Sequence, residues 1–272
     1  HKQLRPASTL KTLTMLTLLP RLKQTDTYTA SVADDEAEGS EVGLIPGQTY
    51  TVKDLFAGLA LPSGNDAAEG LARANGGIEK TVQQMNHEAS RIGASDTHAV
   101  NPSGLDGDGQ YSSAADLSQI FRVGLTMPAF VKLVGTETYN FPDKHSGGTI
   151  PLYTQDKLIT HKYPGIIGGK TGYTTEAGRT FVAAAQQNKH TLIVALLNIG
   201  GNTETTATEL LDWGFENYDH LTPVGKLPQL PTASNEEHGK VNIMLKTENT
   251  TVANVKNTTA ISWTLGILGA LI

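Results

Sequence analysis

Cysteine is absent from the 272 residues of the chain. A chain without cysteine has no disulfide framework, no thiolate nucleophile and no cysteine-based metal site. Basic residues are not gathered into runs, and 21 Lys and Arg stand against 27 Asp and Glu, for a formal net charge of −6. Nucleic-acid binding needs clustered Lys and Arg, so that class of partner is excluded, and the acidity serves solubility.

Metal-binding patterns are also missing. His87-Glu88 is not followed by a second histidine at helical distance, so there is no HExxH motif. Asp106 and Asp108 in GLDGDG lack the EF-hand pattern and its closing glutamate, and the segment is predicted to be a structural turn near the floor of the site. We predict no metal and no other cofactor. The histidines read as surface or loop residues are His87, His98, His145 and His161.

Three short motifs follow one another along the chain: SxxK at 8–11, SxN at 63–65 and KTG at 170–172. An SxxK arises by chance about once in a chain of this length, so it carries little weight alone. Each motif occurs only once, however, and their order is that of β-lactamases and penicillin-binding proteins, with SGN where SDN is common. The combination predicts a serine nucleophile that works without histidine, and therefore an acyl-transfer enzyme.

The spacing of Ser8 and Lys11 suits a nucleophile and its base. If residues 7–19 are helical, the two side chains stack at i and i+3 with Cβ atoms about 5–6 Å apart. A lysine accepts a proton only where burial or a nearby cation makes its neutral form accessible, and Lys170 would be that cation. Pro6 suits a helix start, which leaves the Ser8 N–H free to bind an oxyanion. The alternative is that Ser8 only caps the helix and that Lys11 is a solvated surface charge.

The other two motifs have chemical roles at a turn and at a strand. Ser63 and Asn65 lie in a Pro-Ser-Gly-Asn turn, where alternate side chains can point the same way. The alternative is an ordinary turn that caps the next helix. In KTG, Lys170 supplies a fixed positive charge, Thr171 a hydroxyl, and Gly172 is predicted to let a ligand approach the strand edge.

The wider sequence around the motifs resembles the serine-type D-alanyl-D-alanine carboxypeptidases among the low-molecular-mass penicillin-binding proteins. This resemblance covers about residues 4–218. It implies a penicillin-binding enzyme of the cell envelope that trims peptidoglycan stem peptides and that β-lactam antibiotics acylate. The stretches that carry it are RPASTLKTLT (5–14), GLALPSGNDAAEGLA (58–72), NPSGLDGDG (101–109), YPGIIGGKTGYT (163–174) and AGRTFVAAA (177–185).

The resemblance also implies roles on the acyl-transfer side of the site. Ser8 would be the nucleophile and Lys11 its base. Ser63 would relay a proton to the leaving amine, and Asn65 would hold Lys11 and the substrate amide.

On the binding side, the resemblance implies that Lys170 and Thr171 hold the terminal carboxylate of the substrate. The second oxyanion donor would be the backbone N–H of Tyr173, where the family often has histidine. Arg179 is interpreted as an exposed strand arginine in preference to a second carboxylate ligand.

Hydrophobic periodicity predicts an α+β fold, with an antiparallel sheet, a helical cluster and the active site at the seam between them. The resemblance implies that this fold is of the β-lactamase/transpeptidase type. The helices are expected at 52–61, 66–74, 79–91, 113–125 and 204–218, and the strands at 168–173, 180–186 and 191–197.

Three regions are expected along the chain. Residues 1–220 form the catalytic domain, without the strands that the family places before SxxK. Residues 221–238 are rich in Pro and polar residues and read as a linker. Residues 239–272 hold strand-like segments and the uncharged apolar run AISWTLGILGALI (260–272). That run is shorter than the roughly 20 residues of a membrane span, and either a cut membrane anchor or a buried strand or helix fits it.

Three other functions stay open. A class A-like β-lactamase shares all three motifs, but it needs a glutamate that activates water, and residues 89–136 contain none. A non-catalytic cell-wall-binding relative could keep the fold without activity. An endopeptidase acting on cross-linked stems would use the same acyl step with another leaving group.

Overall fold

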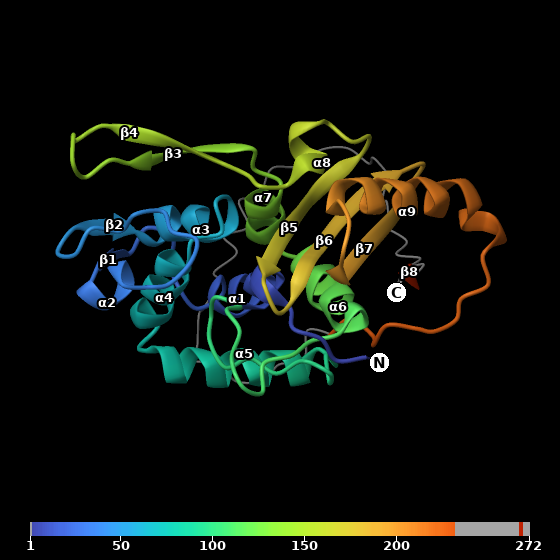
Figure 1. Ribbon diagram of the computed structural model, residues 1–272, viewed down its shortest axis with the longest axis horizontal. Helices are drawn as coiled ribbons and strands as arrows, with labels where there is room; N and C mark the ends of the chain where they lie inside the picture. The colour runs from blue at the N-terminus through green and yellow to red at the C-terminus, as the bar shows by residue number, and fades with distance from the viewer. Residues whose placement is uncertain (1, 232–266, 269–272) are drawn as a thin grey trace, which may run out of the picture.

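The computed structural model describes residues 2–231 and 267–268, which form a helical lobe beside an antiparallel sheet (Figure 1). The helices are η1 (Ala7–Leu10), α1 (Lys11–Leu18), α2 (Val32–Asp35), α3 (Val52–Ala60), α4 (Asn65–Ala74), α5 (Ile78–Arg91), α6 (Ala114–Gly124), α7 (Pro128–Val134), α8 (Lys157–Thr160), α9 (Thr203–Asn217) and η2 (Tyr218–His220). The strands are β1 (Thr27–Thr29), β2 (Thr49–Thr51), β3 (Thr138–Pro142), β4 (Thr149–Tyr153), β5 (Ile166–Thr174), β6 (Gly178–Gln187), β7 (His190–Ile199) and β8 (Ile267–Leu268).

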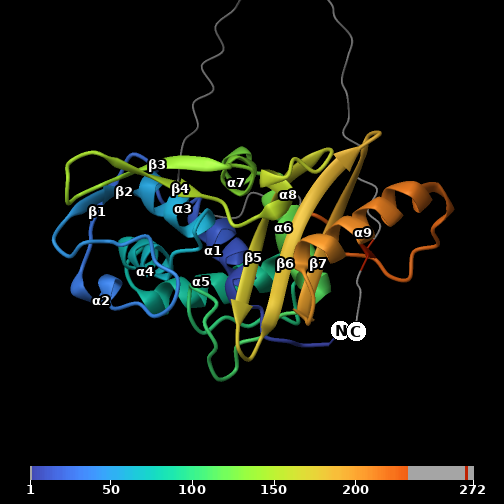
Figure 2. The same ribbon diagram turned by 45° about the horizontal axis from the view of Figure 1, so that its top comes forward.

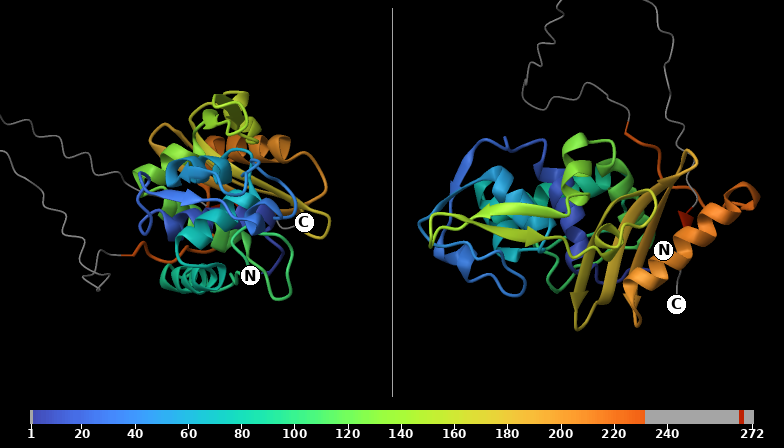
Figure 3. Two further views of the ribbon diagram at one scale, coloured as in Figure 1. Left: turned by 90° about the vertical axis from the view of Figure 1, so that its left-hand side faces the viewer. Right: turned by 90° about the horizontal axis from the view of Figure 1, so that it is seen from above.

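The main sheet has the order β5-β6-β7-β8, with antiparallel pairing except between β7 and β8. Helix α9 lies across one face of it and α6 packs against the other (Figure 3). Along β6, Phe181, Ala183 and Ala185 join the core beneath α9, while Val182 and Ala184 join the core of the helical lobe. Because both faces are covered, the strand is apolar almost throughout instead of alternating.

Helix α1 is the centre of the helical lobe, and every one of its residues is buried. Helices α3, α4, α5 and α6 contact it, and the β1–β2 strand pair and the β3–β4 hairpin lie outside this cluster (Figure 2). A helix buried on all sides needs no polar face, which explains why α1 carries no charge except Lys11. The one lysine is therefore placed in the interior by the fold.

Most of the predicted elements are present with their ends displaced by a few residues. Helices α3, α4, α5, α6 and α9 and strands β5, β6 and β7 match the predicted elements. The predicted helix at 7–19 is divided, because its first turn, η1, is a 3-10 helix that follows Ala7 in the left-handed region (φ 47°). Helices α2, α7 and α8 and the β1–β2 and β3–β4 strand pairs were not predicted, since such short segments carry little periodic signal.

The C-terminal predictions fall mainly outside the described residues. Residues 221–231 contain no helix or strand, and there the Pro228 carbonyl accepts a hydrogen bond from Arg122 of α6. Of the predicted 239–272 region, with its apolar run at 260–272, the structure describes only β8. Within the described part of the chain, no single helix is long and apolar enough to span a membrane; α6 and α7 meet that test only as a pair bent by 117°.

Asp66, at the start of α4, ties the SxN turn to the loop before α3. Its buried carboxylate accepts backbone N–H bonds of 2.8–3.0 Å from Val42, Gly43, Leu44 and Ala67. A carboxylate that accepts several amide hydrogen bonds provides partners for buried backbone N–H groups that water does not reach. The Asp66 side chain thus helps to fix the site turn to the lobe, together with the backbone bond from Asn65 to the Ser40 carbonyl.

We expect Asp66→Asn to lower the free energy of unfolding by about 3 kcal/mol, because an amide replaces one acceptor oxygen with a donor and leaves buried N–H groups unpaired. Urea denaturation followed by circular dichroism measures this. The exposed Asp35→Asn is the matched control and should change the value by less than about 0.5 kcal/mol. Equal stability of the two variants would contradict the anchoring role.

Candidate active site

The nucleophile motif and the KTG strand touch at Gly172. A Cβ atom at Gly172 would lie 2.8 Å from the Ser8 nitrogen and 3.0 Å from the Thr9 nitrogen, which is closer than side-chain carbons approach. Thr180 of β6 donates a hydrogen bond of 2.9 Å to the carbonyl of Pro6, just before η1. The missing side chain at Gly172 thus makes room for the backbone of η1, which is a different use from the ligand approach predicted from the sequence.

Ser8 and Lys11 face each other across one turn. In a 3-10 helix the side chains at i and i+3 are eclipsed, so the η1 geometry aligns them more directly than an α-helix would. The Lys11 Nζ lies 2.9 Å from the Ser8 Oγ and 2.6 Å from both the Asn65 Oδ1 and the Ser103 carbonyl oxygen. A neutral amine has two N–H groups for Asn65 and Ser103 and one lone pair for the Ser8 proton.

Burial makes this neutral form of Lys11 accessible. The side chain has no exposed surface, and desolvation is the main cause that moves its pKa well below the ordinary value of 10.5. The charge on Lys170 lowers the pKa further, while Asp66 acts in the opposite direction. A lysine with these neighbours has the properties of a general base.

Ser63 is held in a strained backbone conformation with its hydroxyl unused. Its φ of 69° lies in the left-handed region, which is rare for a residue with a side chain. The Ser63 Oγ is buried and has no hydrogen-bond partner among the described residues. Two residues later, Asn65 donates from Nδ2 to the Glu38 carbonyl and accepts from Lys11. Ser63 therefore keeps a hydroxyl available to a ligand, while Asn65 makes one bond through each end of its amide.

Lys170 is buried beneath the strand, with 2% of its surface exposed. Its Nζ donates to the Thr171 carbonyl at 3.0 Å. Burial lowers the pKa of Lys170 to about 7, and Asp156 opposes the shift. The Thr171 hydroxyl donates to the Gln155 Oε1 at 3.1 Å, and the Gln155 amide donates to the Pro62 carbonyl at 2.9 Å. Gln155 thus bridges the KTG strand and the SxN turn.

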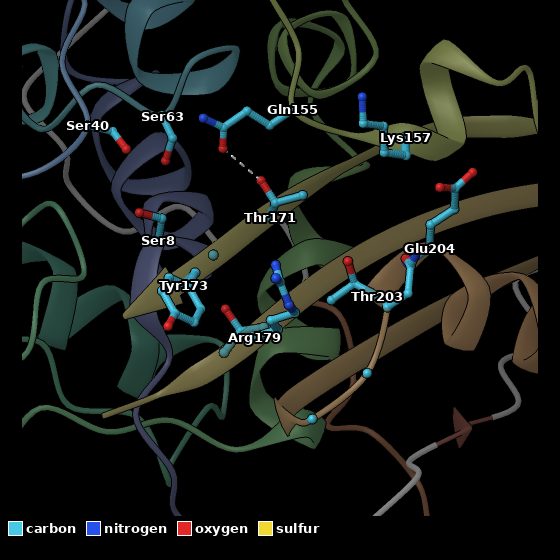
Figure 4. Close-up of a pocket in the computed structure, with 15 residues that line it drawn as sticks. Ser8, Ser40, Ser63, Gln155, Lys157, Thr171, Tyr173, Arg179, Thr203 and Glu204 are labelled. Atoms are coloured by element: carbon cyan, nitrogen blue, oxygen red, sulfur yellow. Dashed lines mark hydrogen bonds between the residues drawn. The ribbon is translucent and has the colours of Figure 1, made fainter. Parts of the chain in front are cut away.

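Ser8, Ser63 and Thr171 line one pocket of about 790 Å³, whereas Lys11, Asn65 and Lys170 are buried behind its lining. Figure 4 shows Ser8, Ser40 and Ser63 together at one end, with Thr171 beside them. Glu204 lies at the far end, where it pairs with His161. The pocket is lined by Ser8, Ser40, Ser63, Gln155, Lys157, Thr171, Gly172, Tyr173, Arg179, Thr180, Gly200, Gly201, Asn202, Thr203 and Glu204.

The structure brings all of the predicted site residues to this seam. Tyr173 is 61% exposed at the edge of the pocket. Arg179 is exposed, as predicted, but it also lines the pocket, with its guanidinium 5.5 Å from the centre of the Tyr173 ring. Sequence reasoning missed Gln155 and the carbonyl of Ser103. The only available signal for Ser103 was its place in NPSGLDGDG, and Gln155 had none.

A serine beside a buried lysine, at the seam of a helical lobe and an antiparallel sheet, defines a serine acyltransferase of the penicillin-recognising class. A family model described as D-alanyl-D-alanine carboxypeptidase matches residues 1–201. The chain belongs to the D-alanyl-D-alanine carboxypeptidase family, as the resemblance predicted.

Individual relatives agree with this assignment. The D-alanyl-D-alanine carboxypeptidase DacB2 of Mycobacterium tuberculosis is 45% identical over 217 residues, which cover 77% of this chain and 74% of that protein. DacF of Bacillus subtilis is 32% identical and matches 80% of this chain and 58% of its own length. A crystal structure of the M. tuberculosis D-alanyl-D-alanine carboxypeptidase has a TM-score of 0.76 at 41% identity, covering 84% of this chain and 87% of that one.

A structure of a Streptomyces DD-transpeptidase aligns with a TM-score of 0.73 at 27% identity, and covers 79% of this chain and 89% of that one. The predicted α+β fold of the transpeptidase type is therefore confirmed.

We expect Gly172→Ala to lower the rate of acylation by a fluorescent penicillin about 100-fold, because the added methyl group displaces η1 and misplaces Ser8 by a fraction of an ångström or more. Time-resolved gel fluorescence measures this rate. Gly148→Ala is the control, since a Cβ there meets only the Ser146 hydroxyl at 3.6 Å. Equal labelling rates in both variants would contradict the close-approach role of Gly172.

Proposed function

We propose that the protein is a serine-type D-alanyl-D-alanine carboxypeptidase that removes the terminal D-alanine from peptidoglycan stem pentapeptides. The observation that carries this proposal is the buried Lys11 amine 2.9 Å from the Ser8 hydroxyl. Family membership supports the reaction. Action on peptidoglycan implies a location outside the cytoplasm, in the cell envelope, whereas the predicted membrane anchor concerns residues outside the described ones.

In the first step, Lys11 takes the Ser8 proton as the Ser8 Oγ attacks the carbonyl carbon of the penultimate D-alanine. Ser8 is half-buried, so its hydroxyl is reachable from the pocket. The negative charge on the carbonyl oxygen is bound by the backbone N–H groups of Ser8 and Tyr173. The Ser8 N–H lies in the first turn of η1, where amide hydrogens have no helical partner.

In the second step, the carbon–nitrogen bond breaks and the nitrogen of the terminal D-alanine receives a proton through Ser63. The buried, unpartnered Ser63 hydroxyl supports this role, because it can accept a proton from Lys11 and donate its own. Water then attacks the ester carbon and its proton passes to Lys11. The bond between that carbon and the Ser8 Oγ breaks, Lys11 returns the proton to the Ser8 Oγ, and the shortened peptide leaves.

The substrate carboxylate is held at KTG. Lys170 supplies the positive charge and the exposed face of the strand offers the Thr171 hydroxyl, which lines the pocket. Arg179 adds a second cation on the pocket wall. A chain-terminal carboxylate is thereby distinguished from an internal amide, which has no charge.

β-Lactam antibiotics are covalent inhibitors in this scheme because they acylate Ser8 and leave slowly. A fast β-lactamase needs a carboxylate that activates water beside the ester. Within the described residues, the carboxylate that lines the pocket belongs to Glu204, which lies at the opposite end from Ser8 (Figure 4). The pocket therefore favours a penicillin target over a penicillin-hydrolysing enzyme.

We expect the protein to release one D-alanine from a synthetic stem pentapeptide and to retain a fluorescent penicillin for minutes or longer. Ser8→Ala should abolish both, because the Ser8 hydroxyl is the pocket hydroxyl that is hydrogen-bonded to the Lys11 amine. Mass spectrometry of the peptide and gel fluorescence of the protein measure the two outcomes.

The control for this experiment is Ser90→Ala, an exposed position on α5, which should keep both activities. Turnover by Ser8→Ala would refute Ser8 as nucleophile. Loss of the penicillin label within seconds would indicate a β-lactamase instead.

The dependence of kcat/KM on pH should be bell-shaped. The acid limb reports protonation of Lys11, whose pKa burial holds well below 10.5, and the alkaline limb reports loss of the Lys170 proton with a pKa of about 7. For kcat, the alkaline limb should lie at higher pH, since a bound carboxylate raises the pKa of Lys170. Stopped assays from pH 5 to 10 test this, and a flat profile would contradict both roles.

A further inference from the structure

Residues 101–105 form a turn that lies outside the three motifs and contacts the proposed base. They open the stretch NPSGLDGDG and contain no helix or strand. The carbonyl oxygen of Ser103 is 2.6 Å from the Lys11 Nζ, and Ser103 is buried. A main-chain oxygen of this turn is therefore a direct partner of the Lys11 amine.

The Asn101 side chain holds the turn together. Its Oδ1 accepts hydrogen bonds from the Gly104 N–H at 2.8 Å, the Ser103 hydroxyl at 3.1 Å and the Ser103 N–H at 3.2 Å. Its Nδ2 donates to the Leu105 carbonyl at 2.9 Å. Asparagine forms turns in this way, because its short side chain reaches the backbone two residues further on. Four hydrogen bonds of the turn thus involve Asn101.

One of these bonds sets the direction of the carbonyl that faces Lys11. The Ser103 carbonyl and the Gly104 N–H belong to the same peptide group, and a trans peptide is planar with its C=O and N–H on opposite sides. Because the Asn101 Oδ1 accepts this N–H, the carbonyl points away from Asn101. The Lys11 Nζ lies on that other side, within hydrogen-bond distance of the carbonyl oxygen.

The turn is also fixed to the helices on both sides of the nucleophile motif. The buried Thr14 hydroxyl, three residues after Lys11 on α1, donates to the Pro102 carbonyl at 2.7 Å. Gly104 has a φ of 86°, and a Cβ atom there would lie 2.1 Å from the Ala7 carbonyl oxygen of η1. The peptide group that faces Lys11 is therefore held against the same helical segment that carries Lys11.

The position of the Ser103 carbonyl determines how the amine is oriented. A neutral amine has two N–H groups and one lone pair, and a carbonyl oxygen can only accept a hydrogen bond. When the two N–H groups point to the Asn65 Oδ1 and the Ser103 carbonyl, the lone pair is left for the Ser8 hydroxyl at 2.9 Å. Without the Ser103 carbonyl, the amine is free to rotate and its lone pair turns away from Ser8.

We propose that Asn101 is a positioning residue: by holding the Ser103–Gly104 peptide group, it directs the lone pair of Lys11 to the Ser8 hydroxyl. This role rests on the proposed function, in which Lys11 is the base. Neither Asn101 nor Ser103 lines the pocket. A change at Asn101 should therefore slow the chemical step and leave ligand binding unchanged.

The test measures labelling by a fluorescent penicillin over a range of concentrations, which separates the rate constant of acylation from the dissociation constant. We expect Asn101→Ala to lower the rate constant about 30-fold, within the roughly 100-fold that an ångström of misplacement costs, with the dissociation constant changed by less than about twofold. Asn101→Ser should lower it only about fivefold, because a serine hydroxyl accepts the same backbone hydrogen bonds more weakly.

Asn86→Ala is the matched control. The Asn86 side chain of α5 also bonds to the backbone: its Oδ1 accepts the Ala99 N–H and its Nδ2 donates to the Ala99 carbonyl, both at 2.8 Å. These bonds hold the chain two residues before Asn101 and are not made to the Ser103–Gly104 peptide group. This variant should lose stability and keep the wild-type rate constant of acylation. Thermal melting of each variant accompanies the labelling.

Wild-type rate constants in both Asn101 variants would overturn the proposal. An equal fall in Asn86→Ala, or a smaller labelled fraction with an unchanged rate constant, would overturn it too, since those results come from lost stability. If Asn101→Ala does not fold, the rate constant of Asn101→Ser decides. The wild-type protein is tested in parallel for labelling and for release of D-alanine, so a failure of the proposed function itself is seen separately.

Discussion

Two lysine side chains are buried at one seam, and most features of the site follow from that constraint. Lys11 and Lys170 are each almost without exposed surface. Two ammonium groups in such a setting repel each other and lack hydration, so a state with both protonated is costly. Lys11 has three close oxygen partners, and the Lys170 Nζ donates to the Thr171 carbonyl at 3.0 Å. Burial lowers the pKa of both amines.

The backbone holds these groups in place through strain and close approach. Ala7 and Ser63 both have positive φ, immediately before the nucleophile and in the SxN turn. Such strained conformations persist only where the surrounding contacts hold them, and they are common at functional sites. Gly104 packs against the Ala7 backbone where a side chain would collide, and Asp66 ties the turn to its neighbours. The Ser8 hydroxyl, the Lys11 amine and strand β5 are thus positioned before a ligand binds.

The pocket places three serine hydroxyls and a carboxylate at opposite ends. Ser8, Ser40 and Ser63 lie together at one end, while Glu204 is paired with His161 at the other. Family membership agrees with this chemistry, and similarity extends from a carboxypeptidase to a transpeptidase of the same fold. The shared part is the acyl-enzyme step, and what differs among such proteins is the group that leaves or enters afterwards.

The sequence by itself determined the long periodic elements, the α+β class and the three motifs, because helix and strand patterns and the Ser8–Lys11 spacing are local properties. Lys170 as the cation stays a prediction from the motif. Gln155 carried no motif, and the close approach of η1 at Gly172 was not predicted, since each depends on segments that meet only in the folded chain. The short β1–β2 and β3–β4 strand pairs were missed because such short segments carry little periodic signal. The residues of the proposed chemistry lie in short motifs that can be read from the sequence. The lowered pKa values of Lys11 and Lys170 depend on burial, which only the tertiary structure decides.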